Sequence, residues 1–182
     1  MRIGLSASLA AFAMVLAISL PVSATVVVNM DIEQMAPVAP VVLVGEVNRV
    51  ESSWNKDKTK IHTRAWITPS EILKGPAKLG TVVVKTIGGK VGDTIAQLDG
   101  APKFAEGEKV LVFLEPRKDG DGYLTIGLYM GKFKVFKDPK TGTEMVVRDM
   151  PESGVKIVGS NPVGVKLHSL DEVRALFAGG SK

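Results

Sequence analysis

The sequence predicts a mainly-β domain, a small barrel or sandwich, with a short helix near its C-terminus. Segments rich in Val, Ile and Thr recur along the chain, and Gly, Pro and Asp separate them, which is the pattern of short strands joined by turns. The clearest helix start lies near the end, where Ser169 and Glu172 have capping-box spacing. The 182 residues are 45% hydrophobic and 23% charged, a composition typical of a chain with a packed core.

Residues 1–24 have the pattern of a secretory signal peptide. Arg2 precedes an uncharged apolar stretch over residues 3–20, and Pro21 separates this stretch from the small-residue pattern that ends at Ala24. We expect cleavage after Ala24 and an exported bacterial protein, periplasmic or secreted. The alternative is a retained membrane anchor, because this stretch approaches the length that spans a bilayer. Removing these 24 residues, which carry one cation and no acid, leaves 158 residues and lowers the net charge from +4 to +3.

The chain contains no cysteine, which excludes several functional classes. It can form neither disulfides nor thiolate metal centres nor iron–sulfur clusters, and it has no cysteine nucleophile. Its two histidines, His62 and His168, are too few for a three-histidine metal site. A net charge of +3 after cleavage is far below that of a typical nucleic-acid-binding domain. We therefore expect no metal, no cofactor and no nucleic acid partner.

The patterns divide the chain into four parts. These are the signal peptide at residues 1–24, an N-terminal extension with a short helix at 25–39, an OB-like β domain at 40–150, and a C-terminal extension at 151–182 with a helix at about 169–178. In the N-terminal extension, Asn29 or Asp31 is suited to cap a helix over residues 32–35. Pro37 and Pro40 then end that helix, because proline interrupts helical hydrogen bonding.

The first two strands of the β domain differ in pattern. Residues 41–50 begin as a fully apolar run and alternate after Gly45, which predicts a strand with a bulge at that glycine. Residues 60–68 alternate throughout, which predicts a second strand with one apolar face. Pro69 should end this strand, and residues 71–74 should continue as an edge segment.

Three further strands complete the domain. The third covers residues 81–87 and is followed by a long connection that a buried Phe104 should hold in place. The fourth, residues 109–114, is continuously apolar and should therefore be central in the sheet. Residues 119–122, Asp-Gly-Asp-Gly, form a hairpin turn into the fifth strand at residues 123–128.

A second hairpin is predicted from residues 132–137 and 144–148, which flank the turn at residues 138–142. Alternation in the first of these strands directs Phe133 and Val135 inward. The outward positions are Lys132, Lys134 and Phe136. Outward lysines are typical of an edge strand that must not pair with other chains. A cationic, aromatic binding surface is the competing interpretation of this pattern.

A series of motifs runs through residues 40–148. In order, they are Val44-Gly45-Glu46-Val47, Ile61-His62-Thr63, Glu71-Ile72-Leu73-Lys74-Gly75, Gly88-Gly89, and the run from Phe104 to Leu114. This order resembles the netrin-like module of the tissue inhibitors of metalloproteinases, and more closely uncharacterised exported bacterial relatives of it. The resemblance implies a five-stranded OB-type barrel with an added hairpin. Those inhibitors use an N-terminal cysteine, whereas the expected mature chain begins at Thr25 and has no cysteine, so the inhibitory residues have no counterpart here.

The candidate ligand-binding residues are Lys60, His62, Arg64 and Trp66, which share one face of the second strand. Together they form a cationic and aromatic platform of the kind that OB folds use for oligonucleotides and sugars. A solvated strand face, whose long side chains shield the sheet, explains the same pattern. We favour this second interpretation because the other strands do not extend the platform.

No catalytic or metal site emerges from the sequence. Residues 88–92 resemble a phosphate-binding loop, but Val91 stands where such a loop requires Ser or Thr. The turn at residues 119–122 lacks the further ligands of a calcium loop. Neither histidine stands in a recognisable nucleophile–base pattern. We therefore expect no enzymatic activity.

The expected function is that of an exported, non-enzymatic β-barrel module that binds a protein or another cell-envelope component. Its contact surface should be formed by loops around residues 52–59 and 88–103. The alternative is an OB-type barrel that holds an anionic oligomer on the face formed by Lys60, His62, Arg64 and Trp66. Neither function involves stable membrane insertion once the signal is cleaved.

Overall fold

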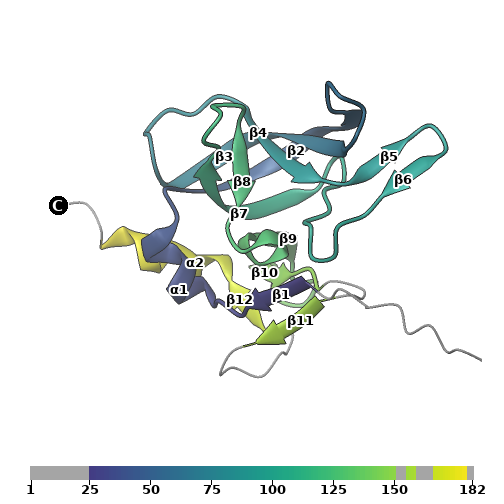
Figure 1. The fold of residues 1–182 in the computed structure, drawn as a ribbon. Helices are drawn as coiled ribbons and strands as arrows, with labels where there is room; N and C mark the ends of the chain where they lie inside the picture. Colours follow the sequence, from purple (N-terminus) through teal and green to yellow (C-terminus); the bar gives the residue numbers. More distant parts are fainter. Residues whose placement is uncertain (1–24, 151–154, 159–165, 180–182) are drawn as a thin grey trace, which may run out of the picture.

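A closed five-stranded β-barrel is the main feature of the computed structural model, which describes residues 25–150, 155–158 and 166–179 (Figure 1). The predicted signal peptide, residues 1–24, lies outside the described residues. Within the described part of the chain, no helix is long and apolar enough to cross a membrane. The mainly-β prediction is confirmed.

Five strands close the barrel. They are β2 (Val41–Trp54), β3 (Ile61–Lys74), β4 (Val82–Ile87), β7 (Lys109–Pro116) and β8 (Tyr123–Thr125). Strand β2 pairs antiparallel with β3 and β7, and β3 pairs antiparallel with β4. Strand β8 closes the barrel because it pairs parallel with β4 and antiparallel with β7. This is the strand order of an OB-type barrel, as predicted.

Two apolar clusters, one on each side of β2 and β7, form the core. Leu43 and Val112 belong to the cluster inside the barrel, whereas Val44 and Phe113 belong to the cluster under the helices. Because both faces are buried, the sequences of these strand segments are apolar at successive positions instead of alternating. Strand β7 lies between β2 and the added hairpin, which confirms its predicted central place.

The added hairpin extends the sheet beyond β7. It consists of β9 (Lys132–Lys137) and β10 (Glu144–Arg148). The 3-10 helix η1 (Leu128–Gly131) precedes it, and the edge strand β12 (Leu167–Ser169) pairs with β10. Both hairpin strands begin and end at the predicted residues. The fifth barrel strand was expected to reach residue 128 but ends at Thr125. The reason is local, since Gly127 and Leu128 have φ angles of 62° and 59°, which are incompatible with a strand.

Two helices, α1 (Ile32–Val38) and α2 (Leu170–Ala178), lie together below the barrel (Figure 1). The predicted capping box of α2 is present. Ser169 Oγ accepts a hydrogen bond from the backbone N–H of Glu172 at 3.1 Å, and the Glu172 carboxylate accepts one from the N–H of Ser169 at 3.0 Å. These bonds satisfy two backbone donors that the helix start leaves free.

Helix α1 was expected over residues 32–35, ended by Pro37 and Pro40. It begins at the predicted residue and stops before Pro40, but it includes Pro37 and continues to Val38. Its N-cap is Asp31, which is one of the two residues that the sequence predicted for this position. The ammonium group of Lys74 donates hydrogen bonds to the carbonyls of Ala36, at 2.9 Å, and Pro37, at 3.0 Å. These contacts stabilise the last turn despite the proline.

Strand β3 was expected to end at Pro69, and this prediction is wrong, because the strand continues to Lys74. Pro69 lies opposite Gly45, at a shift in the register between β2 and β3. A proline is tolerated where the ladder is already irregular. Gly45 is the predicted bulge, and a Cβ atom there would lie only 2.6 Å from the carbonyl oxygen of Thr68. The absence of a side chain therefore lets the two strands approach.

Two small sheets stand apart from the main one. Strand β1 (Thr25–Val28) pairs parallel with β11 (Val155–Val158), and β5 (Gly89–Val91) pairs antiparallel with β6 (Thr94–Ala96). The β5–β6 hairpin projects from one end of the barrel (Figure 1). It falls within the segment that the sequence indicated only as a long connection, because strands of three residues are too short to show alternation.

Candidate functional site

The predicted ligand-binding residues lie on the outer face of the barrel. His62, Arg64 and Trp66 alternate along β3 with residues that point into the barrel, and Lys60 lies in the turn just before the strand. The inward residues Ile61, Ala65 and Ile67 are buried, as the alternation predicted. His62, Arg64 and Trp66 therefore share one side of the sheet, and Lys60 precedes them outside the strand.

Neighbouring strands add cations to this face, and the turn between β7 and β8 adds an acid. Arg49 of β2 places its guanidinium 4.7 Å from the centre of the Trp66 ring. Arg64 lies opposite Lys85 of β4, and both reach the carboxylate of Asp121, at 3.5 Å and 2.7 Å. Part of the positive charge is thus neutralised within the face. The arrangement therefore fits a solvated face as well as it fits a platform that binds an anion.

His62 contributes little charge to the face at neutral pH. Burial is the main cause that lowers the pKa of its imidazole below the usual value, and the nearby cations Lys85 and Arg117 lower this pKa further. Its Nδ1 atom is buried and has no hydrogen-bond partner among the described residues. The imidazole is therefore neutral near pH 7 and acts as a polar group, not as a cation.

A second region lies at the end of the barrel, where the segment of residues 97–104 passes between the β5–β6 hairpin and η1. Three cavities of the described structure share Leu98, Ala101 and Pro102 of this segment, with volumes of about 410, 320 and 290 Å³. Phe104 packs against the barrel interior, as expected, but it is half-buried instead of fully buried. We call this region the loop end.

The largest of the three cavities is an open groove beside the β5–β6 hairpin. Two exposed isoleucines line it, Ile87 with 50% and Ile95 with 69% of its surface exposed. At its inner side, the hydroxyls of Ser52 and Thr63 are hydrogen-bonded to each other at 2.8 Å. A Cβ atom on Gly89 would lie 2.3 Å from Ser52 Oγ, so glycine is required for the hairpin to approach here.

The two predicted contact loops are therefore not equivalent. Residues of the segment 88–103 line all three cavities. From the segment 52–59, only Ser52 lines any of them. The remainder of that segment forms the end of β2 and the turn before β3.

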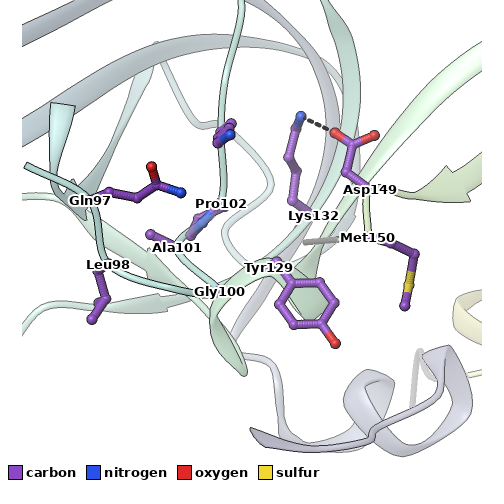
Figure 2. Close-up of a pocket in the computed structure, with 10 residues that line it drawn as sticks. Gln97, Leu98, Gly100, Ala101, Pro102, Tyr129, Lys132, Asp149 and Met150 are labelled. Atoms are coloured by element: carbon purple, nitrogen blue, oxygen red, sulfur yellow. Dashed lines mark hydrogen bonds and ion pairs between the residues drawn. The ribbon is translucent and has the colours of Figure 1, made fainter. Parts of the chain in front are cut away.

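The smallest cavity contains a buried lysine that the sequence analysis placed on the surface (Figure 2). Only 2% of the side chain of Lys132 is exposed, and its ammonium group lies 2.8 Å from Glu108 Oε1 and 2.6 Å from Asp149 Oδ2. The outward prediction for Lys132 is wrong, because the 97–104 segment and Asp149 cover this side of β9. The edge-strand explanation fails with it, since β9 is paired on both sides, with β7 and β10.

The predictions for Phe133, Val135 and Lys134 in β9 are confirmed. Phe133 and Val135 point inward to the cluster under the helices. Lys134 is exposed, and Phe136 is half-buried. Nothing in the local pattern distinguishes Lys132 from Lys134, so the burial of Lys132 has no sequence signal within the strand itself.

Comparisons with known proteins add no family. No known protein family matches the chain, and no curated protein matches it. The netrin-like resemblance stays a prediction, whereas the barrel is established by its strand order. Among the described residues, no cluster of three or more His, Asp or Glu side chains has the arrangement of a metal site.

Proposed function

We propose that this chain is an exported, non-enzymatic module that binds a protein or another component of the bacterial cell envelope through the loop end. The observation that supports the binding surface is the open groove with Ile87 and Ile95 exposed on its wall. Exposed apolar residues gathered at a concave surface are typical of interaction sites. Export is inferred from residues 1–24.

The binding test is crosslinking in the native envelope followed by mass spectrometry. The unmodified protein and the double variant Ile87→Ser/Ile95→Ser are compared at equal expression. Val38→Ser is the matched control, because Val38 is an exposed apolar residue on α1 and lines none of the three loop-end cavities. The proposal requires one specific adduct that the double variant loses and the control keeps. No specific adduct, or one that survives in the double variant, counts against it.

The export test is the intact mass of the protein recovered from the envelope or the medium. Cleavage after Ala24 gives a chain that begins at Thr25. A full-length chain that remains with the membrane fraction contradicts the cleavage and supports the anchor.

The second candidate function is the binding of an anionic oligomer on the outer face of β3 and β4. It is favoured by one observation, namely that Lys85 and Arg49 extend the predicted group formed by Lys60, His62, Arg64 and Trp66 across three strands. This outer face corresponds to the face that OB folds use for oligonucleotides and oligosaccharides.

The second function predicts that an anionic oligosaccharide binds less tightly as salt is added and as Trp66 is replaced by alanine. Trp54→Ala is the control, because Trp54 is exposed but is paired with Ile61, which faces the barrel interior and not the outer face. Binding that is insensitive both to salt and to Trp66→Ala would exclude this function.

A further inference from the structure

The small cavity around Lys132 combines a charged wall with an apolar one. We call it the Lys132 pocket; its lining residues used below are Leu98, Pro102, Tyr129, Lys132, Asp149 and Met150. Figure 2 shows the side chains of Lys132 and Asp149 meeting on one side, with Tyr129 and Met150 next to them and the loop with Leu98 on the other side. The pocket has a volume of about 290 Å³, at the lower limit for small-molecule sites.

The ammonium group of Lys132 has little capacity left for an anion. Two of its three N–H donors are directed to Glu108 and Asp149, and the ring of Phe104 lies 5.3 Å from Nζ, within cation–π range. Two carboxylates surround one ammonium group, so this cluster carries a net negative charge. Lys103 also lines the pocket and adds a positive charge, which its exposure to solvent weakens but does not remove.

Asp149 leaves an acceptor available. Its Oδ2 accepts the hydrogen bond from Lys132, whereas its Oδ1 takes part in no hydrogen bond among the described residues. The side chain is 47% exposed, so a ligand that enters the pocket can reach it. A carboxylate oxygen in a half-buried site binds a protonated amine through a charge-assisted hydrogen bond.

The rest of the pocket favours an apolar stem. Leu98, Pro102 and the ring of Tyr129 contribute lining without charge, and Met150 adds a flexible thioether. Methylene groups pack favourably on such a surface. The volume is sufficient for a short chain and small for a polycyclic ligand.

The geometry points to a binding site for a primary ammonium group on a short apolar stem, as found in an alkylamine or a lysine side chain. The ammonium group donates to Asp149 Oδ1, and the stem lies against Leu98, Pro102 and Tyr129. The site belongs to the loop end and in that sense rests on the proposed function, yet its test needs no envelope partner. Failure of the amine-binding test therefore does not imply that the proposed function is wrong, and the reverse also holds.

The test is calorimetric titration of the purified protein with pentylamine. Pentanol and pentanoate are the matched probes, because they keep the stem and replace the ammonium group by a neutral or a negative one. We expect pentylamine to bind about threefold more tightly than either, or more, because a half-exposed carboxylate contributes up to about 1 kcal/mol. Asp149→Asn should weaken pentylamine binding by the same factor, whereas Asp138→Asn, in the exposed turn between β9 and β10, should leave it unchanged.

A second measurement locates the ligand in the unmodified protein. On addition of pentylamine, the methyl NMR signal of Met150 should shift, and that of Met35, a buried residue of α1, should not. A tripeptide with a central lysine and blocked ends distinguishes the source of the amine. Tighter binding of the peptide indicates a partner's lysine, and tighter binding of pentylamine indicates a free small amine.

Equal binding of amine, alcohol and carboxylate overturns the assignment, as does undiminished binding to Asp149→Asn. No binding of pentylamine or of the peptide at millimolar concentration also overturns it. If the envelope adduct of the proposed function is found in that case, the loop end binds its partner without this pocket.

Discussion

Replacing Lys132 with methionine should lower the free energy of unfolding by about 3 kcal/mol. The side chains of Lys132 and Glu108 are both nearly inaccessible, so the substitution leaves a carboxylate in a water-poor site without its counter-ion. Removing one partner of a buried ion pair costs about 3–5 kcal/mol. Asp149 adds little, since exposed pairs contribute about 0–1 kcal/mol. The lower end of the range applies because Glu108 Oε2 still accepts a hydrogen bond from the backbone N–H of Ala105.

The assay is urea unfolding followed by circular dichroism, with two further variants. Lys134→Met changes the exposed lysine of the same strand and should alter the free energy by less than about 0.5 kcal/mol. The double variant Lys132→Met/Glu108→Gln also removes the unpaired Glu108 carboxylate. It should recover about half or more of the free energy of unfolding that Lys132→Met loses. A loss below about 1 kcal/mol for Lys132→Met, or a double variant less stable than Lys132→Met, would refute the account of this cluster.

Three further predictions concern the fold and its pH dependence. Gly45→Ala should cost about 1–3 kcal/mol in urea unfolding, because the new Cβ meets the Thr68 carbonyl, whereas Gly80→Ala, which meets nothing within 4 Å, should cost almost nothing. Folding lowers the pKa of His62. As the pH falls below about 6.5, the unfolded chain therefore binds a proton on His62 more readily than the folded chain does, and the free energy of unfolding should decrease. His62→Gln should flatten that slope, and an unchanged slope contradicts the buried imidazole. Ser169→Ala should cost about 1 kcal/mol through loss of the cap of α2, measured as a lower unfolding midpoint.

Elements with local signals were predictable from the sequence. The β9–β10 hairpin and helix α2 begin where their turn and capping residues indicate, because these signals act within a few residues of the chain. The face shared by His62, Arg64 and Trp66 follows from the period of two along β3, whereas Lys60 lies before that strand. The order of the barrel strands was inferred from the motif resemblance and not from any single strand.

Features that depend on distant segments were not predictable. Pro69 stays within β3 because Gly45, on another strand, provides the irregular register opposite it. Lys132 is buried by residues 97–104 and by Asp149, which the alternation within β9 does not reveal. The Asp121 carboxylate that partly neutralises Arg64 and Lys85 comes from the turn between β7 and β8, more than thirty positions later in the chain. In each case tertiary contacts determine the environment of a residue whose local pattern is ordinary.

The central claim is that the loop end is the surface on which this module binds its envelope partner. Site-specific photo-crosslinking in living cells tests it most directly, with a photoreactive amino acid placed either at Ile95, on the groove wall, or at Thr141, in the exposed turn between β9 and β10. The account predicts a discrete adduct from Ile95 and none from Thr141. The same adduct from both positions, or from Thr141 alone, would contradict it.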